Sequence, residues 1–111
     1  MIDNITEVKE LMNKIKEFLP IPANPTKAFI HLMRDQGVKV KAKYDVLIKK
    51  VMYLGDEGGI ACEVALPNQK EGKVTIISLT HLRVKANHPL VKDIRAYQIK
   101  RTKKLAQQED Y

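Results

Sequence analysis

The sequence predicts an α+β fold with two N-terminal helices, a three- or four-stranded antiparallel sheet, and a long basic C-terminal helix packed on that sheet. Near both ends of the chain, apolar residues recur every three or four positions, which is typical of helices with one buried side. Between residues 38 and 79 they alternate with polar residues instead, which is typical of strands. A chain of 111 residues has room for one apolar core, and we expect a single domain over residues 1–111.

The first helix is predicted within residues 1–19. Asn4 has a side chain suited to capping a helix, and Glu7 follows at the spacing of a capping box. A wide apolar stripe follows at helical spacing, and this stripe can either close a core in the same chain or dock on a second subunit. Both alternatives stay open from the sequence. The stripe consists of Ile5, Val8, Leu11, Met12, Ile15, Phe18 and Leu19.

A second, shorter helix is predicted after a linker. Three prolines make residues 20–25 a semi-rigid linker in this prediction. Asn24 is expected at the helix cap, Pro25 at the first helical position, and Gly37 just past the end. The buried side of this helix is predicted to hold Phe29, Leu32 and Met33.

Strands are expected from Val38 onwards. The first strand is predicted to be long and to form an edge, because its polar face carries Lys39, Lys41 and Lys43. The apolar phase slips by one residue at Lys49–Lys50, which indicates a bulge. After a glycine-rich turn at 55–59, a second strand is expected over 60–66. The third strand, 74–79, is apolar on both faces and is therefore expected at the most buried position, before residues 80–87 leave the sheet.

The last helix is predicted to begin at Pro89, within an α-β-β-β-α unit that covers residues 26–105, and residues 106–111 are expected to fray. Its apolar face, which holds Leu90, Ile94, Tyr97 and Leu105, is expected to dock on the sheet. Lys92, Arg95, Lys103 and, less centrally, Lys100 lie on the opposite face. Arg101 falls among the apolar residues, so it either reaches the surface along its aliphatic stem or pairs with an acid elsewhere.

The positive charge is concentrated in this part of the chain. Residues 83–104 hold eight Lys and Arg residues and a single acid, an excess equal to the net charge of +7 of the whole chain. A localised basic patch indicates an anionic partner, although a helix face kept basic for solubility is the alternative. The residues predicted to contact nucleic-acid phosphates are Lys85, Lys92, Arg95, Lys100 and Lys103.

One stretch resembles a known family. The run from Asn24-Pro25 through Gly37 to Tyr44 resembles the opening of a double-stranded-RNA-binding domain, which starts its first helix at a similar Asn-Pro. The resemblance implies a helix, three antiparallel strands and a helix over residues 24–105, and binding to duplex RNA. The family's adjacent lysines before the last helix are absent here, and Lys85, Lys92 and Arg95 are the nearest substitutes.

Patterns of catalysis and metal binding are absent from the sequence. His31, His81, His88 and Cys62 are scattered without the paired spacing of metal ligands, and the roles of the three histidines stay open. Cys62 is expected to be a buried core thiol. We therefore expect a protein that is not an enzyme and has no cofactor and no metal. It is expected to bind nucleic acid, RNA in preference to DNA, without sequence specificity. The alternative is an adaptor subunit or homodimer that uses the N-terminal helix.

The sequence also carries an expectation about cellular location. No apolar run approaches the roughly 20 residues that cross a bilayer, and the N-terminus lacks the features of a signal peptide. A single cysteine fits a reducing compartment. A cytoplasmic protein without a membrane partner is therefore expected.

Overall fold

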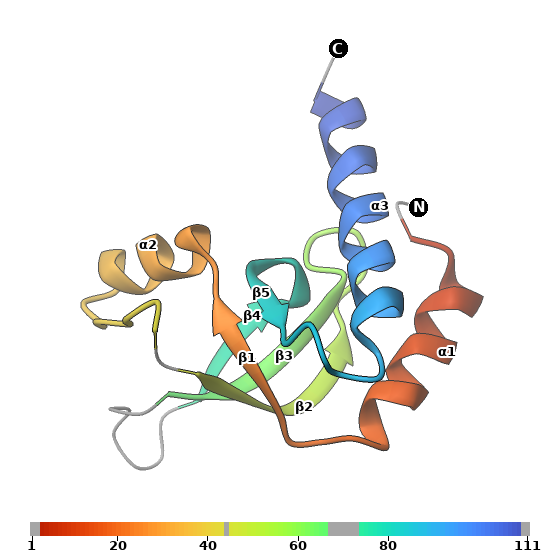
Figure 1. Cartoon of the computed structure of the whole chain (residues 1–111). Helices are drawn as coiled ribbons and strands as arrows, with labels where there is room; N and C mark the ends of the chain where they lie inside the picture. The colour runs from red at the N-terminus through yellow and green to blue at the C-terminus, as the bar shows by residue number, and fades with distance from the viewer. Residues whose placement is uncertain (1–2, 44, 67–73, 110–111) are drawn as a thin grey trace.

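The computed structural model describes residues 3–43, 45–66 and 74–109. In this part of the chain it shows an α+β fold with three α-helices and one antiparallel sheet of five strands (Figure 1), rather than the predicted three or four. The elements in chain order are α1 (Ile5–Lys16), β1 (Ile21–Pro25), α2 (Lys27–Asp35), β2 (Val46–Tyr53), β3 (Ile60–Ala65), β4 (Thr75–Ser78), the 3₁₀ turn η1 (Leu79–His81), β5 (Leu82–Val84) and α3 (Val91–Glu109).

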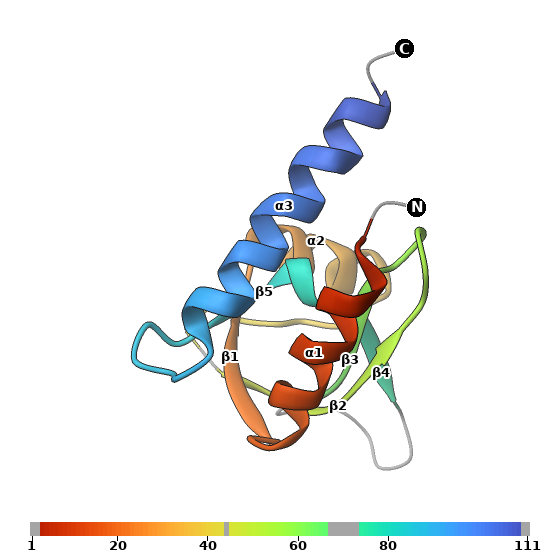
Figure 2. The ribbon, with the colours of Figure 1, turned by 90° about the vertical axis from the view of Figure 1, so that its right-hand side faces the viewer.

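The sheet is strongly curled. Its strand order is β4-β3-β2-β1-β5, and all neighbours are antiparallel. Strands β4 and β5 are thus the two outer strands, yet only the three residues of η1 join them. So short a connection can link opposite edges only if the twisted sheet bends back on itself. Figure 2 shows this curled sheet with α1 and α3 side by side against it.

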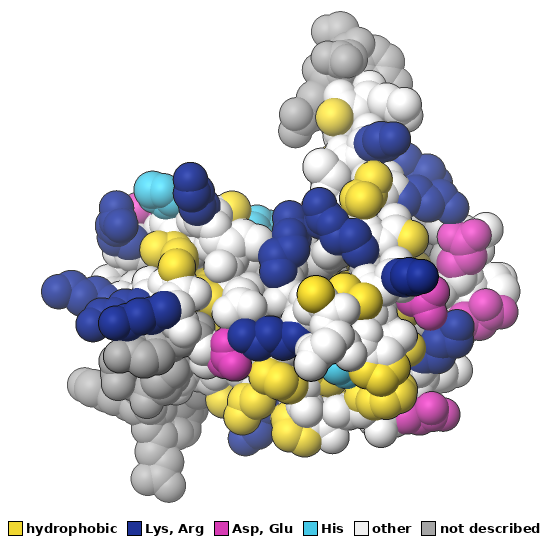
Figure 3. Space-filling view, in the orientation of Figure 1, with side chains coloured by type: hydrophobic (Ala, Val, Ile, Leu, Met, Phe, Trp, Pro, Cys, Tyr) yellow, Lys and Arg dark blue, Asp and Glu magenta, His cyan; other side chains and the backbone are white. Residues whose placement is uncertain are grey.

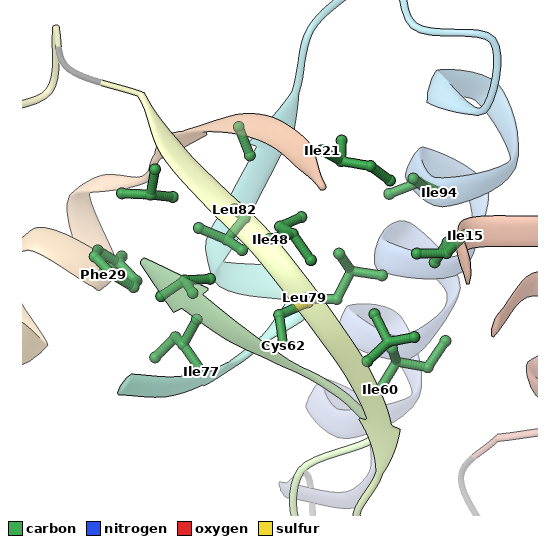
Figure 4. Close-up of a cluster of buried hydrophobic side chains, with 14 of the residues drawn as sticks. Ile15, Ile21, Phe29, Ile48, Ile60, Cys62, Ile77, Leu79, Leu82 and Ile94 are labelled. Carbon is green, nitrogen blue, oxygen red and sulfur yellow. The ribbon is translucent and has the colours of Figure 1, made fainter. Parts of the chain in front are cut away.

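One apolar cluster fills the interior, with buried side chains from the three α-helices, all five strands and η1. Figure 4 shows labelled members from these elements pointing into the common interior, among them Phe29 of α2 and Ile94 of α3. Helix α1 contributes Val8, Leu11 and Ile15, each less than 10 % exposed. This part of the apolar stripe therefore closes the core of its own chain, whereas Ile5 and Phe18 of the same stripe are 38 % and 40 % exposed.

Several local predictions are confirmed. The side chain of Asn4 caps α1, because its Oδ1 accepts hydrogen bonds from the backbone N–H of Thr6 at 3.0 Å and of Glu7 at 3.2 Å. Gly37 follows the end of α2 with a φ of 80°, in the left-handed region that favours glycine. The pairing of β2 with β3 shifts register between Ile48 and Lys50, where the sequence predicted a bulge.

The predicted proline-rich linker is wrong, since it contains β1. Asn24 and Pro25 belong to this strand, and Thr26 caps α2 instead by accepting a hydrogen bond from the N–H of Phe29 at 3.2 Å. Prolines are tolerated because β1 pairs with β2 over residues 21–23 and with β5 over residues 23–25. Pro22 and Pro25 each lie where only one neighbour is paired, so each has a side on which no ladder N–H is needed.

The long lysine-bearing edge strand is also wrong. No strand occurs among the described residues 38–43 and 45, and Tyr44 lies outside the described residues. Strand β2 begins only at Val46 and lies in the middle of the sheet. Val38 and Val40 are half-buried and pack against the core from a connecting segment. Their alternation with lysines therefore reflects this packing and not a strand.

Four further features differ from the prediction. Strand β4, expected to be the most buried, is an outer strand in which Ile76 is 49 % exposed. Residues 80–87, expected to leave the sheet, include β5. Helix α3 continues to Glu109, past the predicted end at residue 105, and Leu32 of α2 is exposed rather than buried.

Candidate nucleic-acid interface

Charged side chains are segregated on the face of the molecule seen in Figure 3. Lys and Arg side chains gather over α2 and the segment that follows it, over the β5 region, and along α3. Asp and Glu side chains gather mainly at the edge formed by α1. Four of the five predicted phosphate contacts are in α3, and Lys85 directly follows β5. The local partner of each side chain decides which of these positive charges remain available.

Two of the five predicted contacts are ion-paired. The Nζ of Lys85 lies 2.7 Å from Oδ1 of Asp45, and the Nζ of Lys100 lies 2.9 Å from Oε2 of Glu7 on α1. In both pairs the side chains are substantially exposed, so each pair contributes at most about 1 kcal/mol to stability. A carboxylate neutralises each of these two lysines in the free protein. Because each ion pair is weak, replacing the carboxylate with a phosphate would cost little free energy.

The other three predicted contacts have no acidic partner among the described residues. Lys92, Arg95 and Lys103 are exposed along the outward side of α3. Arg95 makes one weak contact, from its Nη1 to Oε1 of Gln98 at 3.4 Å. Lys92 and Lys103 stand eleven residues apart in the sequence, which is about 17 Å along a helix axis. This ridge carries three uncompensated positive charges.

Arg83 is a basic residue of this face that the sequence analysis did not assign. It lies on β5, and its Nη1 donates to the carbonyl oxygens of Thr80 at 3.1 Å and of Leu82 at 2.9 Å. Partial burial and then the positive charge of Arg95 lower the pKa of its guanidinium. No sequence signal could have paired these two arginines, because β5 is too short to show a periodicity and was not predicted.

Arg101 does not belong to the basic face. Its Nη1 lies 2.8 Å from Oδ2 of Asp3 in a buried ion pair, and its Nη2 donates to the carbonyl oxygen of Asp56 at 2.7 Å. The hydroxyl of Tyr53 donates to the same Asp3 carboxylate at 3.1 Å. The hydroxyl of Tyr97 accepts a hydrogen bond from the N–H of Ile60 at 2.8 Å. Of the two alternatives for Arg101, pairing with an acid is confirmed.

Burial changes the titration of two core groups. It raises the pKa of Tyr97 to about 12 and that of the Cys62 thiol to about 12. Ordinary values are 10.0 and 9.0, so between these values and 12 the unfolded chain loses protons that the folded chain keeps. Both groups therefore contribute stability that is complete below about pH 9 and is lost as the pH rises towards 12.

We accordingly expect the free energy of unfolding to fall by roughly 4 kcal/mol between about pH 8 and about pH 11. Urea denaturation at the two pH values measures this loss. The Cys62→Ala variant should be less stable at both, with a smaller difference between them. An equal difference in the variant would contradict the role of the thiol. Because the folded thiol stays protonated, Cys62 should also resist thiol reagents until the protein unfolds.

The histidines have separate surroundings. The Nδ1 of His88 accepts a hydrogen bond from the N–H of Leu90 at 3.0 Å, just before α3, and its ring meets that of Phe18 edge to face. The Nδ1 of His81 is buried and has no partner among the described residues, and burial and Arg83 lower its pKa. His31 is exposed on α2. Within the described ranges, no three His, Cys, Asp or Glu side chains are grouped to hold a metal ion.

Comparison with known protein families, with curated proteins and with solved structures finds no match to this chain. None of the described helices is long and apolar enough to cross a membrane.

Proposed function

We propose that this protein binds nucleic acid, RNA in preference to DNA, through the outward side of α3, without reading sequence and without catalysis. The observation that carries the proposal is the uneven compensation of charge on this helix. Lys100 and Arg101, on the side near α1, have carboxylate partners, whereas Lys92, Arg95 and Lys103 have none among the described residues. Uncompensated cations on one ridge favour phosphates, which release counterions when they bind.

Contact with the backbone alone is favoured by the positions of the aromatic side chains. Phe29 is buried in the core, the hydroxyls of Tyr53 and Tyr97 are engaged in the buried polar cluster, and Phe18 lies against His88. Among these rings Phe18 is 40 % exposed, but its ring already contacts His88 before the start of α3, so base stacking has at most one partly occupied ring there. The preference for RNA follows from the sequence resemblance of residues 24–44 alone, because in the structure Asn24 and Pro25 lie in β1 and residues 38–43 form no strand.

Fluorescence anisotropy tests the proposal with labelled double-stranded RNA, single-stranded RNA and double-stranded DNA, from ~50 to ~200 mM salt. We expect the affinity for RNA to fall steeply with salt. Neutralisation of the ridge by Lys92→Gln, Arg95→Gln and Lys103→Gln together should reduce the logarithmic salt slope by about 2–3 on a duplex, since each phosphate contact contributes ~0.9. Affinity at the lowest salt should fall at least about tenfold.

A matched control removes the same net charge from α1, by Lys9→Glu and Lys16→Gln together, and keeps Lys14 in its ion pair with Asp93 of α3. This variant should keep most of the slope and affinity, because both lysines lie on the helix that also carries Glu7 and Glu10. Equal losses in the ridge variant and in this control would show that only net charge matters. Absence of binding to all three nucleic acids at the lowest salt would end the proposal.

A protein partner is the second candidate function. The observation that favours it is the outer strand β4, where Ile76 is 49 % exposed and the neighbouring Val74 is 61 % exposed. Exposed apolar side chains on an outer strand suit the addition of a partner strand. Sedimentation of the protein alone and of Ile76→Glu distinguishes the cases. A dimer that the substitution dissolves supports this candidate, whereas a monomer in both removes self-association.

A further inference from the structure

Two arginines from different elements, Arg83 and Arg95, lie near one another at the junction of η1, β5 and α3. Gln98 of α3 is buried, and its Nε2 donates to the carbonyl oxygens of Leu79 at 2.7 Å and of Leu82 at 2.8 Å. Arg83 donates to the same Leu82 carbonyl at 2.9 Å, and Arg95 contacts the Oε1 of Gln98 at 3.4 Å. The buried amide of Gln98 therefore lies between the two arginines. It contacts Arg95 directly and shares the carbonyl oxygen of Leu82 with Arg83.

The two guanidinium groups lack a counter-charge. Within the described residues, Arg83 and Arg95 contact neutral oxygens, and neither forms an ion pair with a carboxylate. Arg95 is close enough for its charge to lower the pKa of Arg83, so the pair repels in the absence of an anion. Each guanidinium has five N–H donors, and the contacts described here use only one nitrogen of each, Nη1.

We propose that Arg83 and Arg95 together form an anchoring site that holds one phosphate of a nucleic-acid backbone between two guanidinium forks. This inference rests on the proposed function and adds a specific contact to it. A phosphate between the two groups would remove their repulsion and accept the unused donors. Arginine suits this task better than lysine, because its planar fork can bind two phosphate oxygens at once. The contacts with the carbonyl oxygens of Thr80 and Leu82 orient the Arg83 fork before the anion arrives, and the weaker contact with Gln98 keeps Arg95 near it.

The test follows the side-chain Nε–Hε signals of the arginines by NMR while inorganic phosphate is added to the full chain. We expect saturable shifts for both Arg83 and Arg95, with a dissociation constant in the millimolar range. Arg83→Lys keeps the charge but loses the fork, and it should weaken phosphate binding at Arg95 at least about tenfold. The matched variant Arg34→Lys, at an exposed arginine of α2, should leave both signals and their saturation unchanged.

The outcomes separate this inference from the function on which it rests. Equal, unsaturable shifts at all arginines, or full phosphate binding by Arg83→Lys, would overturn the anchoring site. If RNA binding then keeps its salt dependence, the proposed function stands without this site. If both arginines are needed for saturable phosphate binding but the protein binds no RNA, the claim that the phosphate belongs to a nucleic-acid backbone would be wrong. Loss of both phosphate and RNA affinity in Arg83→Lys, with an unchanged circular-dichroism spectrum, supports the site.

Discussion

Replacing Gly59 with alanine should destabilise the protein by roughly 2–5 kcal/mol. Gly59 has a φ of 61°, a backbone conformation that costs an alanine about 1–2 kcal/mol. A Cβ at this position would also lie 2.7 Å from Nε of Arg101 and 2.8 Å from its Cζ, and would press against the Tyr97 hydroxyl. Neither side chain has room to withdraw, because both are held by hydrogen bonds, and such overpacking costs about 1–3 kcal/mol more.

Gly37→Ala provides the matched control. Gly37 also has a positive φ, 80°, but a Cβ there would meet no atom within 4 Å. This variant should therefore lose only the backbone contribution, about 1–2 kcal/mol. The free energies of unfolding of the two variants, measured in urea, give the cost of the contact by difference. Equal losses would mean that the Tyr97 and Arg101 side chains yield to the added methyl group.

Replacing Arg101 with methionine should destabilise the protein by about 3–5 kcal/mol, because the substitution leaves the Asp3 carboxylate buried without its counter-charge. Side chains of this pair are only 2 % and 5 % exposed, so the Asp3 carboxylate is largely withdrawn from solvent in the folded protein. The carbonyl of Asp56 would lose its donor as well. Urea denaturation measures the loss.

A double-mutant cycle separates the buried charge from the lost packing. Asp3→Asn combined with Arg101→Met removes both charges, so the double variant should be less destabilised than the sum of the two single variants. A coupling free energy above about 1 kcal/mol is expected for partners in direct contact. Simple additivity of the two losses would contradict the ion pair as the source of the stability.

Much of the local structure could be predicted because local chemistry determines it. The cap at Asn4, the glycine after α2 and the bulge near Lys50 each depend on a few neighbouring residues. The position of Arg101 among apolar residues of its helix correctly indicated an acidic partner as one of two alternatives. The partner itself could not be predicted, because Asp3 lies at the other end of the sequence.

The errors concern strand order and strand partners, which periodicity does not encode. Residues 38–43 alternate like a strand, but no neighbouring strand is available to them. Strand β4 is apolar on both faces, yet it lies at an edge, because its position depends on how the sheet curls. Strands β1 and β5 are short and one contains prolines, so their pairing gave no signal. The arginine pair of the candidate site depends on that pairing and was missed with it.

The pairing of distant segments has a consequence for biosynthesis. Ala23 of β1 pairs with Val84 of β5, and Asp3 finds its counter-charge only 98 residues later, in Arg101. A nascent chain emerges from its N-terminus, so β1 keeps one side unpaired until β5 has left the ribosome. Closing such non-local contacts is slow, and exposed strand edges and apolar surface invite aggregation meanwhile. A polypeptide that ends before α3 would therefore expose apolar surface, and chaperones or proteases would be expected to bind it.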